Sequence, residues 1–315
     1  MPRRVILDCD TGTDDAIAIM LAAARPELDL LAVTAVWGNH AVEHTADNSR
    51  RTLDLIGRSD IPVYAGRGAP VAPPPGAPAA EGSPEPDLLP LPTATTRIEP
   101  QDAVEWLVET ARSTTERFTL VPTGSMSNVA SAVAADPSFV DAVEEIVVMG
   151  GVIERGGLLP EVETNVGYDP EAAQQVLDAG FERLVLVPID TTYRAIVATE
   201  QCATLRDDGG VAAGVAADFI EQRIERYRRL PAMRGRAAAP VHDALTVAYL
   251  VDSTLVTLRP ATVRVHTGDS PTRGRTDIAF DPAGAVRVAV EPDAPRFFEL
   301  LRESLARLKP GPAPS

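Results

Sequence analysis

The fold of this chain is decided near its start, by the stretch Leu7-Asp8-Cys9-Asp10-Thr11-Gly12-Thr13-Asp14-Asp15. An apolar run at residues 5–7 leads into this stretch, and a second apolar run at residues 16–22 follows it. This order is typical of a buried parallel strand that connects through a glycine-containing turn to a helix. The stretch would then lie at the carboxyl end of the strand, where open α/β sheets bind their ligands.

Four carboxylates fall within eight residues here, those of Asp8, Asp10, Asp14 and Asp15. Like charges this close repel strongly, and a helix N-terminus offsets only about half an elementary charge. A hard divalent cation would balance them, because calcium and magnesium prefer carboxylate and carbonyl oxygens. The sequence therefore predicts a metal site. The alternative makes Asp14 and Asp15 ordinary residues of the first helical turn and Asp10 a helix cap.

Composition narrows the classes of protein further. The chain has 315 residues, 45% of them hydrophobic, and a net charge of −16, which argues against nucleic acid or an anionic membrane as a partner. We find no apolar run long enough to span a membrane and no secretory signal, so we expect a cytoplasmic protein. Cys9 and Cys202 are too few for a disulfide framework, and Cys9 is expected in the core. The single lysine, Lys309, argues against Schiff-base and phosphate-loop chemistry.

Apolar strand patterns and helical patterns alternate along the chain. We expect strands at 5–7, 28–36, 61–66, 118–121, 145–149 and 184–189. Helices are expected at 16–22, 103–112, 128–135 and 170–179, and another follows residues 37–39 and ends at about residue 56. Further helices are expected at 212–229, 242–250 and 295–308, and short strands at 261–265, 276–280 and 286–290. This alternation predicts an open, mostly parallel sheet flanked by helices, a Rossmann-like α/β fold.

No domain boundary is evident, so we expect one domain over residues 1–309 and a frayed tail at 310–315. Residues 69–92 are rich in Pro, Ala and Gly, which predicts a surface loop or an active-site flap. The amphipathic helix at 212–229 is compatible with a subunit contact or with a cover over a pocket.

Polar residues follow several of the predicted strands. Asp10 ends the first strand, Asn39 follows the second, Thr123 comes after residues 118–121, and Met149 precedes a glycine pair. Each of them alone is typical of a turn. Because the carboxyl ends of parallel strands share one edge, their joint occurrence with the aspartates indicates a single crevice.

Two further pairs of residues have both a structural and a functional interpretation. Glu163 and Asn165 are ordinary loop residues, or they supply the acceptors and donors that vicinal sugar hydroxyls need. Asp243 is a cap of the helix that follows it, or another metal ligand, with His242 as a proton donor titrating near neutral pH.

Two other motifs suggest competing chemistry. His40, Glu43 and His44 have the H-x-x-E-H spacing of a class of zinc peptidases, but they lack a third ligand and leave the aspartates unexplained. The string Asp8-Cys9-Asp10-Thr11 is similar to the nucleophile motif of haloacid-dehalogenase-like phosphatases. Those enzymes use a downstream lysine, and Lys309 is poorly placed to supply it.

The chain resembles the nucleoside hydrolases of the inosine–uridine-preferring type over nearly its whole length. Residues 8–16 match the signature D-x-D-x-G-x-D-D-A. The other matching segments, in the family's order, are Gly38-Asn39, Pro122-Thr123-Gly124 with Ser127-Asn128, Val148-Met149-Gly150-Gly151, Glu163-x-Asn165 with Asp169-Pro170-Glu171-Ala172-Ala173, and Val241-His242-Asp243. So many motifs in one order make the resemblance specific.

The resemblance implies a role for each matching position. The expected calcium ligands are Asp10, Asp15, the backbone carbonyl of Thr123, and Asp243. The expected ribose contacts are Asp14, Asn39, Glu163 and Asn165, with Met149 lining the pocket. Asp10 would be the general base toward water, and His242 would give a proton to the departing base. A homodimer or homotetramer is also implied.

The chain departs from the family pattern in places. Thr11 stands where proline is common, Thr164 where phenylalanine is common, and residues 154–160 lack an asparagine often used near the ribose 5′-hydroxyl. Recognition of the 5′ end and the preferred base therefore stay open. The main hypothesis is a calcium-dependent hydrolase of ribonucleosides. The alternatives are a divalent-metal phosphatase with Asp8 as nucleophile, or a calcium- or nucleoside-binding protein without turnover.

Overall fold

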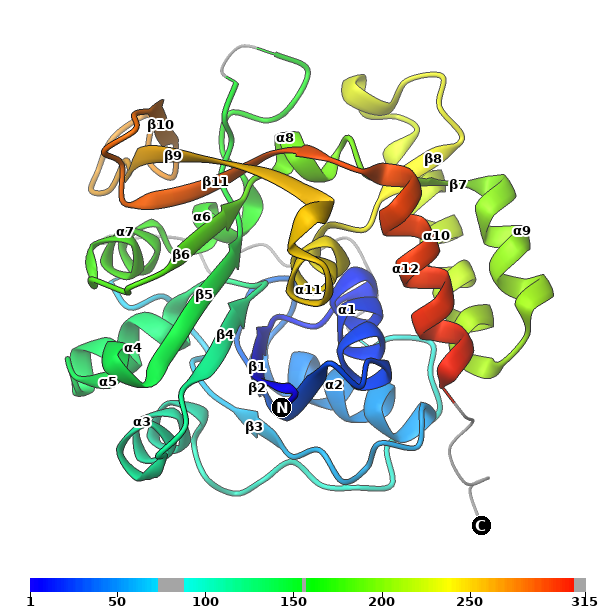
Figure 1. The fold of residues 1–315 in the computed structure, drawn as a ribbon, viewed down its shortest axis with the longest axis horizontal. Coiled ribbons are helices and arrows are strands. Elements are labelled where there is room, and N and C mark those ends of the chain that lie inside the picture. The colour runs from blue at the N-terminus through cyan, green and yellow to red at the C-terminus, as the bar shows by residue number, and fades with distance from the viewer. Residues whose placement is uncertain (73–87, 155–156, 309–315) are drawn as a thin grey trace.

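A computed structural model describes residues 1–72, 88–154 and 157–308 of the chain (Figure 1). Most of the proline-rich segment expected at 69–92 lies outside the described residues. So do residues 155–156 in the loop before Glu163, Lys309 and the expected tail at 310–315. The interpretation of residues 69–92 as a flap therefore stays a prediction.

A nine-stranded sheet runs through the described part of the molecule, in the order β10-β9-β11-β6-β5-β4-β1-β2-β3 (Figure 1). In that order the strands are Thr276–Phe280, Val256–Val265, Val286–Pro292, Leu184–Val187, Val143–Met149, Phe118–Pro122, Arg3–Cys9, Leu28–Ala35 and Val63–Ala65. Neighbours pair parallel from β3 to β11, and β9 pairs antiparallel with both β11 and β10. The predicted open, mostly parallel α/β sheet is confirmed.

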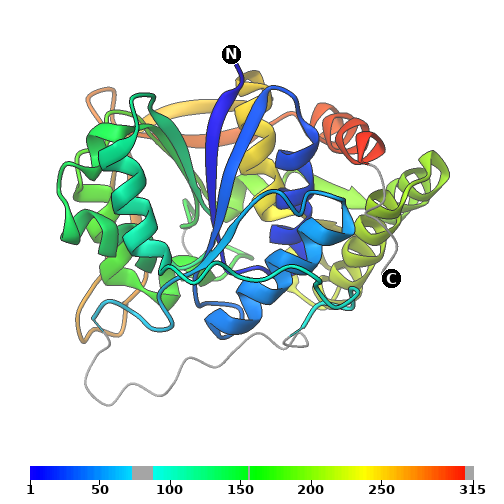
Figure 2. The ribbon, with the colours of Figure 1, turned by 90° about the horizontal axis from the view of Figure 1, so that it is seen from below.

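Helices cover both faces of this sheet (Figure 2). One face packs against α1 (Thr13–Ala24), α2 (Val42–Leu55), α10 (Val211–Tyr227), α11 (His242–Val251) and α12 (Ala294–Arg307), and α9 (Thr199–Asp208) packs on α10. The other face packs against α3 (Ala103–Ser113), α4 (Ser127–Ala135), α5 (Phe139–Ala142) and α7 (Pro170–Asp178). In β1, Val5 and Leu7 lie in the first core and Ile6 in the second. Burial on both faces explains why this strand is a continuous apolar run.

Several short elements were not predicted. They are α5, α6 (Thr164–Tyr168), α8 (Ile189–Thr192), the 3₁₀ turns η1 (Pro231–Met233) and η2 (Ser253–Leu255), and an antiparallel pair of strands, β7 (Ile196–Ala198) and β8 (Ala238–Pro240). Elements of three to five residues are too short to show a hydrophobic period, so no sequence pattern indicates them. One of them matters for the site, because β8 ends two residues before His242 and orients the chain that enters α11.

The topology gathers the predicted site residues at one edge of the sheet. Strands β1, β4 and β5 are parallel neighbours, so Asp10, Thr123 and Met149 lie at or just beyond the same edge. The N-cap positions of α1 and α11 are Gly12 and Val241, so neither Asp10 nor Asp243 is the cap that the alternative interpretation required. No helix in the described ranges is both long and apolar enough to cross a membrane.

Candidate active site

A pocket opens at the carboxyl edge of the parallel strands. Eight of the ten predicted site residues line it: Asp14, Asn39, Thr123, Met149, Glu163, Asn165, His242 and Asp243. The other two, Asp10 and Asp15, are fully buried below the lining. Segments that are far apart in the sequence thus meet at one site, as the sequence predicted.

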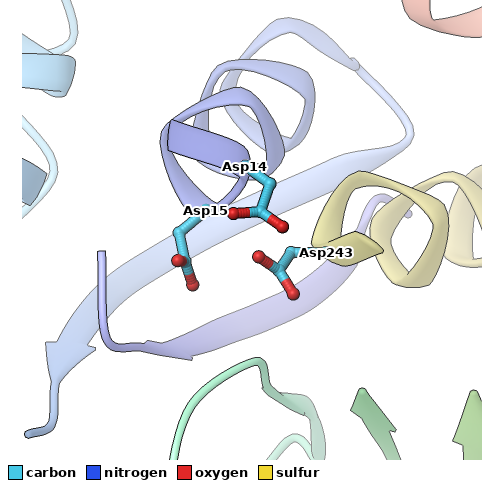
Figure 3. A group of neighbouring side chains, drawn as sticks. All are labelled: Asp14, Asp15 and Asp243. Atoms are coloured by element: carbon cyan, nitrogen blue, oxygen red, sulfur yellow. The ribbon is translucent and has the colours of Figure 1, made fainter. Parts of the chain in front are cut away.

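Three carboxylates of this site point toward one another (Figure 3). Asp14 and Asp15 come from the first turn of α1 and Asp243 from the first turn of α11, and one oxygen of each lies within 4.8 Å of the others. Burial raises the pKa of Asp15 to about 7, and the charge of Asp14 adds to the effect. The pKa of Asp243 also rises well above its usual value, through burial and then through the charges of Asp14 and Asp15. These carboxylates need a positive partner in order to be ionised together.

Asp14 behaves differently from its two neighbours. Burial by itself would raise its pKa, but the guanidinium of Arg223, with Nη1 2.8 Å from Asp14 Oδ1, holds the pKa below the usual value. Asp14 is therefore an anion already paired within the protein. Asp15 instead accepts hydrogen bonds from the Gly12 amide at 3.0 Å and the Thr123 hydroxyl at 2.7 Å.

Asp10 lies beside this group, and its carboxylate is held by Asn39. The backbone N–H of Asn39 donates to Asp10 Oδ2 at 2.7 Å, and its side-chain amide donates to Oδ1 at 3.2 Å. Burial, followed by the charge of Asp15, raises the pKa of Asp10 well above its usual value. The three carboxylates that lie close together in the structure are those of Asp14, Asp15 and Asp243. The predicted metal ligands include Asp15 and Asp243 as well, but Asp10 in place of Asp14.

The opposite wall of the pocket is built around α6. The side-chain amide of Asn165 donates to the carbonyl oxygens of Thr123 at 2.8 Å and Met149 at 3.2 Å. Glu163 caps α6 by accepting from the amides of Asn165 and Val166, and burial raises its pKa. A carbonyl oxygen has two lone pairs, so the Thr123 carbonyl still has one to offer a cation.

His242 is held between two hydroxyl groups. Its Nδ1 lies 2.6 Å from Thr192 Oγ1 and its Nε2 lies 3.1 Å from the hydroxyl oxygen of Tyr227. Burial, and then the positive charge of Arg223, lowers the pKa of His242 to about 3. The imidazole is thus neutral at neutral pH, which differs from the near-neutral titration that we expected.

Comparison with known proteins matches this architecture to one family. The model of the family described as inosine-uridine preferring nucleoside hydrolase matches residues 5–299. The chain belongs to the inosine-uridine preferring nucleoside hydrolase family. It is therefore a ribonucleoside hydrolase, an enzyme that cleaves N-glycosidic bonds.

Individual relatives agree over the full length. The chain is 34% identical to an inosine-uridine preferring nucleoside hydrolase of Leishmania major, covering 98% of this chain and 99% of the relative. It is 35% identical to the pyrimidine-specific ribonucleoside hydrolase RihA of Photobacterium profundum, covering 97% and 99%. A purine-preferring ribonucleoside hydrolase from Gardnerella vaginalis has a similar solved structure, with a TM-score of 0.83, 28% identity, and coverage of 96% and 98%. These relatives differ in the base that they are named for.

The two competing motifs are not arranged for their chemistry in this nucleoside hydrolase. Asp8 is fully buried, and its Oδ1 accepts from the Thr34 hydroxyl at 2.6 Å and the Asn128 amide at 2.8 Å. Asp8 does not belong to the pocket lining, so it cannot act as a nucleophile there. Over the described ranges, the one group of His, Cys, Asp and Glu side chains close enough to share a metal is Asp14, Asp15 and Asp243, without His40 or His44.

Sequence reasoning missed part of the nucleoside hydrolase pocket. The additional lining residues are Pro160, Thr164, Ile189, Tyr193, Arg223, Arg226 and Tyr227. Arg223 and Tyr227 lie four residues apart on α10, so they share one face of the helix. The amphipathic helix predicted at 212–229 therefore covers the pocket, which was one of its two possible roles.

Proposed function

We propose that this enzyme hydrolyses ribonucleosides to a free nucleobase and ribose with the help of a bound calcium ion. The observation that carries the proposal is the group of buried carboxylates from α1 and α11 at the floor of a pocket lined with polar groups. The family to which the chain belongs supports the same reaction.

The side chains present fit a hard cation. The predicted ligands offer oxygen atoms alone; they are Asp10, Asp15, Asp243 and the carbonyl of Thr123. The pKa values of the three carboxylates are raised by burial and then by the charges of neighbouring carboxylates. Calcium takes six to eight oxygen ligands in flexible geometry. A bound calcium ion would lower the pKa of a water molecule and offset the carboxylate charges.

Asp10 is the proposed general base toward the attacking water. Its two oxygens accept hydrogen bonds from Asn39, which fixes the orientation of the carboxylate. A calcium ion bound beside it would lower the pKa of the attacking water, so that a carboxylate could take its proton.

Asp14, Asn39, Glu163 and Asn165 are the proposed ribose contacts. They place carboxylates and amides around the pocket, and those groups match the donors and acceptors of sugar hydroxyls. Negative charge here also stabilises an oxocarbenium-like transition state. Pro160, from the loop that lacks the family's asparagine near the 5′-hydroxyl, and Thr164 also line the pocket.

His242 is the proposed group at the leaving base. A nucleobase is a poor leaving group until it is protonated. The proton would come from the imidazolium form of His242, which carries a proton on Nε2 as well as on Nδ1 and returns to the neutral ring as it gives the Nε2 proton to the departing base. The substrate is a small nucleoside, in keeping with the net charge of −16, and we expect the enzyme to work in the cytoplasm as a homodimer or homotetramer.

The test is incubation with inosine, uridine, adenosine and cytidine, with detection of reducing sugar in calcium and in a chelator. We expect sugar release with calcium, loss of release with the chelator, and no release by Asp10→Ala. If no sugar is released from any nucleoside after calcium addition, the proposed reaction is wrong, and the hypothesis of a binding protein without turnover is favoured. Tightly bound zinc without calcium would support the His40 and His44 motif instead.

A further inference from the structure

Arg223 carries a guanidinium that is almost completely buried in the pocket wall. Its side chain is 3% exposed and contacts three segments of the chain. Nη1 donates to Asp14 Oδ1 at 2.8 Å and to Thr13 Oγ1 at 3.3 Å, at the start of α1. Nε donates to the Pro240 carbonyl at 3.0 Å, at the end of β8, and Nη2 donates to the Tyr227 hydroxyl at 3.1 Å. One side chain thus joins α1, α10 and the strand that leads to His242.

The direction of the first hydrogen bond beyond Arg223 is fixed, because a guanidinium can only donate to the Tyr227 hydroxyl. Thr192 Oγ1 lies 3.1 Å from the Ile189 carbonyl oxygen and 2.6 Å from His242 Nδ1; we assign its single proton to the carbonyl and the imidazole proton to Nδ1. Nε2 of the neutral ring is then an acceptor. The Tyr227 hydroxyl accepts from Arg223 and donates to this Nε2. The Arg223 guanidinium thus orients the Tyr227 hydroxyl, and the Tyr227 hydroxyl in turn orients the His242 ring.

The same guanidinium therefore contacts both ends of the pocket. Asp14 lies at the end where the sugar is expected, and Tyr227 lies with His242 at the end where the base is expected. A lysine would keep the positive charge, but its ammonium is a point charge and cannot reproduce the flat, forked geometry that reaches Asp14, Pro240 and Tyr227 together.

We propose that Arg223 is a positioning residue that sets Asp14 for the ribose and sets the Tyr227 hydroxyl against His242 for the leaving base. The inference rests on the proposed function and adds a residue to it. Arg223 acts through the two side chains that it holds. Its loss therefore weakens substrate binding at one end and leaving-group departure at the other.

The kinetic test uses Arg223→Met and Arg223→Lys with two substrates, inosine and p-nitrophenyl riboside, because p-nitrophenolate departs without a proton. Both variants are expected to raise KM for both substrates. They are expected to lower kcat on inosine by about a hundredfold, as misplaced catalytic groups do, and kcat on p-nitrophenyl riboside by less than about tenfold. Arg228→Met is the matched control, because Arg228 follows the same helix, is exposed and pairs with Glu225 outside the pocket. It should keep both rates.

Two kinetic outcomes would overturn the proposal. One is near-wild-type turnover by Arg223→Lys, which would show that a positive charge at this position is enough and that the forked geometry of the guanidinium is not needed. The other is an equal loss of kcat on both substrates in parallel with a lowered Tm, which would show a purely structural role. Measuring the Tm of every variant separates that outcome from the expected one.

A spectroscopic test is independent of turnover. In ¹⁵N-histidine-labelled wild-type protein we expect the His242 ring to carry its proton on Nδ1, with the signal assigned by comparison with His242→Gln. Arg223→Met should shift the Nε2 signal, because the Tyr227 hydroxyl loses its anchor. An unchanged Nε2 signal would overturn the proposal. If the wild type releases no sugar, the proposed function fails, and this measurement still decides whether Arg223 positions Tyr227 against His242.

Discussion

Asn39 holds both oxygens of the Asp10 carboxylate, through its backbone N–H at 2.7 Å from Oδ2 and its side-chain amide at 3.2 Å from Oδ1. The two residues are separated by 28 others in the sequence and meet because β1 and β2 are parallel neighbours that end at the same edge. A general base must keep one orientation toward the proton that it takes, and this pair of hydrogen bonds provides that orientation.

Removal of the Asp10 carboxylate should therefore abolish turnover. We expect Asp10→Ala to lower kcat on inosine by about 10³-fold or more, and Asn39→Ala to lower it less, because the Asn39 backbone N–H still donates. Sugar release at saturating nucleoside measures the effect. Asp29→Ala is the control, since Asp29 is exposed on β2, and it should keep the wild-type rate. Near-wild-type turnover by Asp10→Ala would contradict the assignment of the base.

Gly38 packs so closely on Asp10 that a side chain there should disturb the same carboxylate. A Cβ added at Gly38 would lie 2.1 Å from Asp10 Oδ2, a distance that forces the carboxylate to move. We expect Gly38→Ala to lower kcat by about 10²-fold. Gly214→Ala is the matched control, because nothing lies within 4 Å of the added Cβ on α10, and it should stabilise the protein by about 0.5–1 kcal/mol with unchanged turnover. Equal activity of the two variants would argue against the tight packing around Asp10.

The sequence predicted the sheet and most of the pocket because both depend on local patterns. The strand–turn–helix unit around Asp10 and the polar residues after the parallel strands have clear signals, and a parallel sheet brings strand ends together without further information. Asp14 and Asp15 were found for that reason, whereas the ligand role of Asp243 came from the resemblance of Val241-His242-Asp243 to the nucleoside hydrolases.

The part that could not be predicted depends on how α10 packs over the pocket. Arg223 and Tyr227 have the spacing of any two residues on one helical face, and the amphipathic pattern alone does not say which surface the helix covers. The strand β8, which helps to place His242, has three residues and therefore no period. The low pKa of His242 also depends on burial and on Arg223, neither of which the sequence shows.

Asp8 provides a test against the phosphatase alternative. Its Oδ1 accepts from Thr34 and Asn128, and Asp8→Asn can keep both bonds through its own carbonyl oxygen. We expect Asp8→Asn to retain nucleoside hydrolysis within about tenfold, since a hydrogen bond to a buried group is worth only about 1 kcal/mol. Wild type and variant should both be inactive on p-nitrophenyl phosphate. Phosphate release by the wild type that disappears in Asp8→Asn would revive the nucleophile assignment.

His242 should matter most for substrates with poor leaving groups. We expect His242→Ala to lower kcat on inosine by about 10²–10⁴-fold, the usual contribution of a general acid, but kcat on p-nitrophenyl riboside by less than about tenfold. His266→Ala is the control, because His266 pairs with Asp277 on β10, away from the pocket lining. Equal losses on both substrates in His242→Ala would show that the imidazole acts on the sugar or on folding.

The buried carboxylates should make the metal-free protein less stable as the pH rises. Burial, and then the charge of Asp14, raises the pKa of Asp15 in the folded state to about 7 from the ordinary 3.8, and the pKa values of Asp10 and Asp243 are raised as well. A raised folded-state pKa contributes stability that is complete below pH 4 and is lost as the pH passes about 7. His242, whose pKa is lowered to about 3, has the opposite trend, but only below its unfolded value of 6.5. The window that isolates the carboxylates is therefore pH 6.5–8.

Thermal unfolding in a chelator and in calcium measures this effect across that window. In the chelator, Tm should fall from pH 6.5 to 8 by on the order of 3 °C, because the carboxylates lose their protons and repel one another. In calcium, Tm should fall less, because the cation binds the ionised carboxylates, so the stabilisation by calcium grows with pH. Asp15→Asn in the chelator should have a weaker pH dependence than the wild type. A Tm that rises with pH in the chelator would contradict the unbalanced charge on which the metal assignment depends.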